Sequence, residues 1–284
     1  MEIIKKIKDM QARSDMIRRE GKTIAFVPTM GFLHEGHLSL IKKARQLGDA
    51  VVVSIFVNPA QFAPGEDFDS YPRALERDCD LAEKEGTDVI FAPNKEDLYS
   101  AVFQTYVSLG ELPNHLCGIS RPIFFRGVAT VVTKLFNIVK PHFAIFGEKD
   151  YQQLLVVRQM VQDLNFDINI VGSPIVREPD GLAMSSRNTY LSTEQRTSAL
   201  SLCKSLKKAQ TLLESGTTDA ATLINEASDF ITSHPETVID YVAICDPETL
   251  EDIKTIDKSA LMAIAVKVGV TRLIDNMILK VAGM

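Results

Sequence analysis

The chain has 284 residues and a formal net charge of -6; 45% of its residues are hydrophobic and 24% are charged. These proportions are typical of a globular enzyme and exclude a disordered or fibrous chain, and the length predicts about two domains. The negative net charge argues against broad nucleic-acid binding, which requires a basic surface. A phosphate ligand must therefore be bound by a local cluster of donors.

The N-terminal segment, residues 1–22, is charged and helical in pattern, without the apolar stretch of a secretory signal. No apolar run approaches the roughly 18 residues that a membrane-spanning helix needs. The cysteines lie far apart without a CxxC pair: Cys79, Cys117, Cys203 and Cys245. This spacing predicts structural thiols in a reducing compartment. Together with the net charge and the lack of a long apolar run, it leads us to expect a cytoplasmic enzyme that binds neither membrane nor nucleic acid.

Short β-branched runs alternate with amphipathic segments along the first part of the chain. We predict strands at Thr23–Pro28, Ala50–Phe56, Asp88–Phe91, His142–Phe146 and Asp167–Val171. We predict helices at 38–47, 74–85, 127–139 and 151–164. This alternation predicts an α/β fold with a doubly wound, parallel, Rossmann-like sheet, which binds ligands at the carboxyl ends of its strands.

The pattern changes near residue 176, where polar and turn residues become frequent. Two helical segments follow, Thr193–Ser215 and Asp219–His234, and then two strand-like runs, Asp240–Cys245 and Leu261–Val268. We therefore predict a Rossmann-like domain over residues 1–176 and a smaller α+β domain over residues 177–284.

The segment after the first predicted strand contains two glycines and two histidines before a helix. Gly31 and Gly36 permit tight turns, and His34 and His37 would lie at the helix N-terminus. Imidazole and backbone N–H groups there can face one anion. A metal site is the weaker interpretation, because H-E-x-H differs from the zinc motif H-E-x-x-H.

Polar residues also follow the other predicted strands. Asn58 and Gln61 offer amides that suit a hydroxyl or a carboxylate. Lys149 supplies a point charge, and Asp150 can cap the next helix or bind ribose hydroxyls. At the domain junction, the segment Ser185–Arg187 combines two hydroxyls with a guanidinium, a combination that can bind an anion.

Five segments together resemble the pantothenate synthetase family of H-x-G-H nucleotidyltransferases. They are PTMGFLHEGH, VSIFVNPAQF, FGEKDYQQL, DGLAMSSRN and RLIDN, in this order along nearly the whole chain. The resemblance implies ATP-dependent condensation of pantoate with β-alanine through a pantoyl-adenylate, with release of pyrophosphate and AMP. It also implies Mg²⁺ with the ATP, a homodimer, and a C-terminal domain that closes over the ATP site.

The resemblance also assigns roles to individual residues. The catalytic residues it implies are His34, His37, Lys149 and Arg187. The ATP contacts it implies are Met30, Gly31, Phe32, Leu33, His34, Glu35, Gly36, His37, Gly147, Glu148, Lys149, Asp150, Val176, Met184, Ser185, Ser186 and Arg187. The contacts to pantoate or β-alanine are Gln61, Gln153, Asn58 and Arg121. Asp78 falls where the family offers a Mg²⁺ contact, although a solvated helix residue is an equal alternative.

One segment departs from the family pattern. Residues Arg121–Val128 read RPIFFRGV, where the family often has R-P-G-H-F-x-G-V, so Ile123 and Phe124 replace a glycine and a histidine. Cys117 likewise stands where an acidic residue is usual. We expect a local change in loop geometry and an unchanged reaction class.

Three other functions are compatible with parts of the pattern. A sibling nucleotidyltransferase would share the H-x-G-H segment but would not explain VNPAQF together with GEKDYQQL. A class I aminoacyl-tRNA synthetase-like enzyme would need a basic surface for its tRNA. A non-catalytic nucleotide-binding regulator would bind ATP without releasing pyrophosphate. An analysis of the reaction products separates all three from a pantothenate synthetase.

Overall fold

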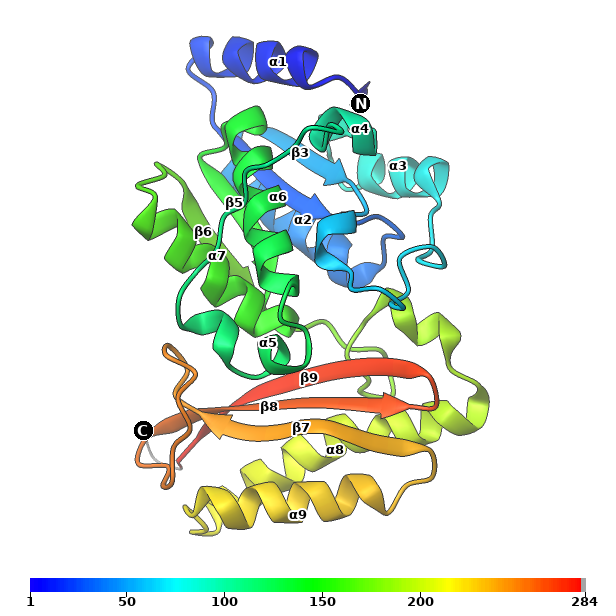
Figure 1. Ribbon diagram of the computed structural model, residues 1–284, viewed down its shortest axis with the longest axis vertical. Helices are drawn as coiled ribbons and strands as arrows, with labels where there is room; N and C mark the ends of the chain where they lie inside the picture. Colours follow the sequence, from blue (N-terminus) through cyan, green and yellow to red (C-terminus); the bar gives the residue numbers. More distant parts are fainter. Residues whose placement is uncertain (282–284) are drawn as a thin grey trace. The chain divides into compact units, whose positions relative to one another are not determined.

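The computed structural model describes residues 1–281, which divide into two compact units (Figure 1). The first unit contains residues 1–110 and 121–174, and the second contains residues 111–120 and the chain from Ile175 onward. The expected boundary lay between residues 176 and 177 and did not include the excursion of residues 111–120 into the second unit.

The first unit is built on a parallel sheet with the strand order β1-β4-β3-β2-β5-β6. Its strands are β1 (Glu2–Ile4), β2 (Ile24–Thr29), β3 (Ala50–Ile55), β4 (Val89–Phe91), β5 (Phe143–Gly147) and β6 (Asn169–Ser173). The chain adds β3 and β4 on one side of β2 and β5 and β6 on the other. The topological switch point therefore lies between β2 and β5, beside the segments that follow them.

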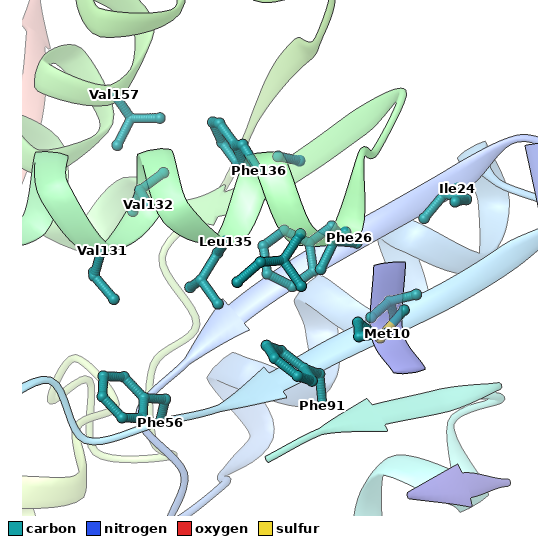
Figure 2. Close-up of a cluster of buried hydrophobic side chains, with 14 of the residues drawn as sticks. Met10, Ile24, Phe26, Phe56, Phe91, Val131, Val132, Leu135, Phe136 and Val157 are labelled. Atoms are coloured by element: carbon teal, nitrogen blue, oxygen red, sulfur yellow. The ribbon is translucent and has the colours of Figure 1, made fainter. Parts of the chain in front are cut away.

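Helices cover both faces of this sheet, as the continuous apolar runs predict. They are α1 (Ile7–Arg19), α2 (Glu35–Leu47), α3 (Leu75–Lys84), α4 (Lys95–Leu98), α6 (Phe124–Val139) and α7 (Tyr151–Asp163). Alternate residues of β2 face opposite layers: Phe26 packs with α1, α6 and α7, and Val27 packs with α2 and α3. Figure 2 shows the first of these clusters, in which Phe26 meets Phe136 of α6 edge to face with ring centroids 6.4 Å apart.

The second unit has an α+β architecture, in which two long helices pack on an antiparallel sheet. Its antiparallel sheet has the order β7-β8-β9, formed by β7 (Thr237–Cys245), β8 (Ser259–Val268) and β9 (Thr271–Lys280). Two helices, α8 (Thr193–Glu214) and α9 (Ala220–Thr232), share one core with this sheet. The short helix α5 (Cys117–Ser120) belongs to the same unit, where Ser120 donates a hydrogen bond to Asp240 of β7 at 3.1 Å.

The predicted fold class is confirmed, and most element bounds agree within a few residues. Two strands differ from the sequence prediction. Residues 2–4 form the edge strand β1 beside β4, although their charged pattern predicts a helix. The RLIDN segment lies inside β9, whose alternating exposure has no long apolar run to reveal it. Helix α6 also begins three residues earlier than predicted, at Phe124 instead of residue 127.

Candidate active site

Segments from three neighbouring strands meet at the carboxyl edge of the parallel sheet. β2 leads into residues 30–34, β3 leads into the short 3-10 helix η1 (Pro59–Gln61), and β5 leads into the 3-10 helix η3 (Glu148–Asp150). Because β2 lies between β3 and β5, the residues predicted to bind ligand occupy adjacent strand ends.

The two histidines lie against each other at the start of α2. Their ring centroids are 4.1 Å apart, and both residues are partly exposed. The backbone N–H of Gly36 donates to His34 Nδ1 at 3.2 Å, and the backbone N–H of His34 donates to His37 Nδ1 at 3.4 Å. Since both Nδ1 atoms accept, the proton of each neutral ring is assigned to Nε2. Each imidazole therefore presents its N–H donor on the side away from the backbone that it caps.

Lys149 lies in η3 after β5, beside the strand β2 that leads to the histidines, and its charge acts on His37. Burial is the main cause that lowers the pKa of His37 well below its ordinary value, and electrostatic interaction with His34 and Lys149 lowers it further. His37 is therefore neutral near pH 7. The structure thus brings together three of the four residues predicted to be catalytic.

The segment Met30–His37, here called the histidine loop, has an unusual backbone. Gly31 and Phe32 both have positive φ, at 84° and 51°. A side chain in that conformation costs roughly 1–2 kcal/mol, so Phe32 needs compensation. Asp78 of α3 supplies it, since its carboxylate accepts the N–H of Phe32 at 2.6 Å and that of Leu33 at 2.8 Å. A Cβ on Gly31 would lie 2.9 Å from Ile55 Cγ2 and 3.1 Å from Asp78 Oδ2, so the turn requires glycine.

Hydrogen bonds fix the direction of the Gln61 amide. Asn58, which is 1% exposed, accepts the N–H of Ala60 at 3.3 Å and donates to Gly127 O at 3.1 Å, so its own amide has one orientation. Its Nδ2 also donates to Gln61 Oε1 at 3.0 Å. Gln61 Nε2 is therefore the end that points to Met30 Sδ, 3.0 Å away, and the amide offers N–H groups on that side.

Tyr99 and Gly127 complete this network. Sequence reasoning missed Tyr99, and it noted Gly127 only as a position that RPIFFRGV shares with the family pattern. The Tyr99 hydroxyl donates to Asn58 Oδ1 at 2.9 Å. A Cβ on Gly127 would overlap the carbonyl of Ala60, so only glycine lets α6 approach η1 so closely. No sequence signal singles out Tyr99, because its contact lies 41 residues away.

The segment after β5 lies at the carboxyl edge of the sheet, where its predicted ligand contacts stay predictions. Gly147 ends the strand with open space where a side chain would be, and Gln153 is partly buried in the first turn of α7. Asp150 occupies the N-cap position of α7, but its side chain makes no capping hydrogen bond. Of its two predicted roles, the ribose contact therefore stays a prediction.

The second unit contains its own ordered segment, Val176–Asn188, here called the junction loop. It is a narrow turn closed by Met184 N–H to Val176 O at 3.0 Å. Ser185 begins the 3-10 helix η4 (Ser186–Tyr190), and its hydroxyl accepts the N–H of Arg187 at 3.3 Å.

A buried ion pair ties the junction loop to β9. Arg177 donates to both carboxylate oxygens of Asp275, at 2.7 and 2.9 Å, and Asp275 is only 2% exposed. The contact to Asp275 raises the pKa of Arg177 in spite of its burial. Asp275 belongs to the RLIDN segment, which the sequence identified only as a signature.

Comparisons with known proteins decide the family. The family profile described as pantoate-beta-alanine ligase matches residues 2–278. The pantothenate synthetase of Desulfatibacillum aliphaticivorans is 61% identical over 99% of this chain and 100% of its own length, and that of Geobacter sulfurreducens is 57% identical over 98% and 99%. The chain belongs to the pantoate–β-alanine ligase family.

Solved structures agree with this membership. A pantothenate synthetase from Thermus thermophilus superposes with a TM-score of 0.93 at 45% identity, covering 98% of this chain and 99% of that one. A pantoate–β-alanine ligase from Francisella tularensis, described as complexed with Beta-gamma ATP and beta-alanine, gives a TM-score of 0.80 at 33% identity over 98% and 97%. Membership in this family makes the chain a ligase that joins pantoate to β-alanine.

Phe124, where the sequence departs from the family pattern, packs against Arg121. The guanidinium of Arg121 lies 4.0 Å above the Phe124 ring and forms a salt bridge with Glu66 at 2.6 Å. Arg121 also donates to Gln61 O at 3.2 Å. The guanidinium therefore holds the segment from Gln61 to Glu66, and the substrate contact expected of Arg121 stays a prediction.

Asp78 does not fit the metal contact that the ligase family implies. Its side chain is fully buried, and both oxygens accept backbone N–H groups. A Mg²⁺ ligand needs an oxygen that reaches the ion at about 2.0–2.1 Å while most of the ion keeps its water. Asp78 is not a solvated helix residue either. Within residues 1–281, no cluster of three or more His, Cys, Asp or Glu side chains is arranged to hold a metal ion.

Two further findings concern membrane-spanning helices and disulfide bonds. No helix among residues 1–281 is both long enough and apolar enough to cross a membrane. In the same residues the four cysteines form no disulfide with one another.

Proposed function

We propose that this ligase works through a pantoyl-adenylate. The observation that carries the proposal is the grouping of His34, His37 and Lys149 at one edge of the parallel sheet, next to the oriented amide of Gln61. The relative from Francisella tularensis, described in complex with Beta-gamma ATP and beta-alanine, supports the choice of ATP and β-alanine as substrates.

The first step forms a bond between a pantoate carboxylate oxygen and the ATP α-phosphorus, and it breaks the bond between that phosphorus and the bridging oxygen. Pyrophosphate leaves with the electron pair. The Nε2–H groups of His34 and His37 donate to phosphate oxygens, and Lys149 places a positive charge against the developing negative charge. ATP enters as its Mg²⁺ complex, so the ion belongs to the substrate.

Pantoate is positioned by amides in this proposal. Gln61 offers N–H donors because Asn58 occupies its oxygen, so it binds an acceptor such as a carboxylate or hydroxyl oxygen of pantoate. Gln153 supplies the second contact. Asn58 and Arg121 contribute indirectly, through the orientation of Gln61 and the position of its backbone.

The second step forms the amide bond. The amine of β-alanine attacks the acyl carbonyl of the adenylate, the bond from that carbonyl carbon to the AMP oxygen breaks, AMP leaves with the electron pair, and the amine releases its proton to solvent. No residue of the chain forms a covalent intermediate, because the substrate carboxylate is the nucleophile of the first step. The chain contributes positioning and charge neutralisation.

Several expectations from the sequence and from the resemblance stay predictions. They are a cytoplasmic location, a homodimer, and an ATP contact by Val176, Met184 and the segment Ser185–Arg187. Light scattering of the purified protein measures the oligomeric state, and the ATP KM of Arg187→Ala tests the junction loop.

A single-turnover experiment tests the proposed intermediate. Enzyme, MgATP and pantoate without β-alanine should release pyrophosphate and leave a bound pantoyl-adenylate that mass spectrometry detects. Adding β-alanine should convert it to pantothenate and AMP. If pyrophosphate appears only when β-alanine is present, the adenylate step is wrong. Release of a dinucleotide product would indicate a sibling nucleotidyltransferase.

A further inference from the structure

We propose that Asp78 is a positioning residue that does not bind Mg²⁺. Its carboxylate accepts the backbone N–H groups of Phe32 and Leu33, here called the backbone cradle, and so holds His34 and His37 in their reactive arrangement. The inference rests on the proposed role of the two histidines. It differs from the family expectation, which assigns this position to the metal.

The first observation is the shape of the cradle. When consecutive residues adopt a turn conformation, successive backbone N–H groups point into one concavity that can bind an anion. Gly31 and Phe32 form such a pair, and the N–H groups of Phe32 and Leu33 point at one carboxylate. The anion in this cradle is a side chain of the protein, so the cradle cannot hold a phosphate at the same time.

The second observation is the fit between the carboxylate and the loop. Asp78 Oδ2 would lie 3.1 Å from a Cβ on Gly31, which leaves no room for a side chain or a hydrated ion on that side. Asp78 is 0% exposed. Burial raises its pKa, whereas the N–H groups of Leu33 and Phe32 act in the opposite direction, so the loop backbone stabilises the charged form.

The third observation is the neighbouring arginine. Arg77 Nη1 lies 3.4 Å from Asp78 Oδ1, and its guanidinium lies 5.1 Å from the centroid of the Phe32 ring. Two consecutive residues of α3 therefore contact the turn, one at the backbone and one at the ring. His34 directly follows Leu33, so a change in the φ of Phe32 displaces the hydrogen bond that the His34 N–H donates to His37 Nδ1.

Asp78→Asn tests the proposal, with Asp80→Asn as the control, since Asp80 is exposed on the same helix. An amide has one oxygen, so it accepts one of the two N–H groups and places a donor against the other. In protein free of metal and nucleotide, amide exchange at Phe32 and Leu33 should accelerate by at least about tenfold in Asp78→Asn. The control should match the wild type.

Kinetics separate positioning from metal binding. We expect kcat of Asp78→Asn to fall by at least about tenfold while the pantoate KM and the Mg²⁺ activation midpoint stay within about twofold, because charge stabilisation by the histidines is lost. A midpoint about tenfold higher, with kcat restored at high Mg²⁺ and amide exchange unchanged, would overturn the proposal. Faster exchange with a normal kcat would also overturn it.

A wild-type measurement covers the case in which Asp78→Asn does not fold. The amide signals of Phe32 and Leu33 should not move when MgCl₂ alone is added, because the carboxylate stays on the backbone. Signals that move with Mg²⁺ would make Asp78 a metal ligand. These signals are independent of turnover, so a chain that makes no pantothenate would refute the proposed function and leave this test intact.

Discussion

The histidine loop and the junction loop are both held by a buried aspartate distant in sequence, but by different chemistry. Asp78 binds two backbone N–H groups 45 and 46 residues away, whereas Asp275 binds the side chain of Arg177, 98 residues away. The first contact depends on backbone shape at Gly31 and Phe32 and is indifferent to most side chains. The second depends on one particular guanidinium. The two loops should therefore respond differently to substitution.

The largest effect should come from breaking the ion pair of the junction loop. Asp275→Asn leaves the partly buried guanidinium of Arg177 without its counter-charge, and we expect unfolding free energy to fall by about 3 kcal/mol. Urea unfolding measures the loss. The double variant Arg177→Met/Asp275→Leu should regain most of it, because paired apolar replacement of a buried ion pair is close to neutral. A single variant as stable as the wild type would contradict this.

Lys149→Ala tests a residue that is proposed to supply charge to the reaction, in contrast to Asp78 and Asp275, which hold loops in place. It should lower kcat at least about a hundredfold, or about 2.7 kcal/mol, because a fixed charge facing the phosphates is lost. The melting temperature should stay near that of the wild type. Lys95→Ala, an exposed lysine in α4, is the matched control. Equal kinetics for the two variants would remove Lys149 from the proposed site.

Gln61→Ala and Gln153→Ala test whether the neighbouring amides hold pantoate or the fold. Each should raise the pantoate KM by an amount that corresponds to about 1–3 kcal/mol, because a polar atom of the substrate loses its partner. ATP binding should change much less. An equal loss for both substrates would show that the amides stabilise the loop at the end of β3 or the start of α7.

Phe124→His should change kcat/KM by less than about tenfold, or about 1.4 kcal/mol. The ring stacks on Arg121 and supplies no charge, and a neutral imidazole can take the same place. Steady-state kinetics with a thermal melt measure the effect. A hundredfold rise in activity would mean that the charge assigned to His34, His37 and Lys149 is supplied elsewhere.

The smallest effect concerns pH and the histidine loop. The folded pKa of His37 lies below its ordinary value of 6.5, so the unfolded chain binds more protons as the solution is acidified. The stability that neutral His37 contributes is complete above 6.5 and is lost as the pH falls below it. Thermal melts should show a shallower decline in His37→Asn. His142 has a lowered pKa as well and acts in the same direction in both proteins. Identical slopes would refute the shift.

Sequence reasoning found the parts of the molecule that depend on local pattern. Buried strands such as β2 and β3 are continuous apolar runs, and His34 and His37 stand out because glycines and a helix start surround them. Asp78 and Asp275 show no such signal for their roles, since each acts through a contact at least 45 residues away. The structural contacts of Arg121 were hidden for the same reason. Its partner Glu66 lies 55 residues earlier, and nothing local shows that the guanidinium is occupied.

The excursion of residues 111–120 into the second unit sets an order for biosynthesis. Ser120 bonds to Asp240, 120 residues later, and Asp240 is also the partner of Arg272. At roughly 5–20 residues per second, the ribosome needs about ten seconds to add that much chain. The first unit can fold around α6 during this time, while residues 111–120 wait as an open loop for β7. A nascent chain that ends after residue 174 would therefore expose a ten-residue segment with no sheet to receive it.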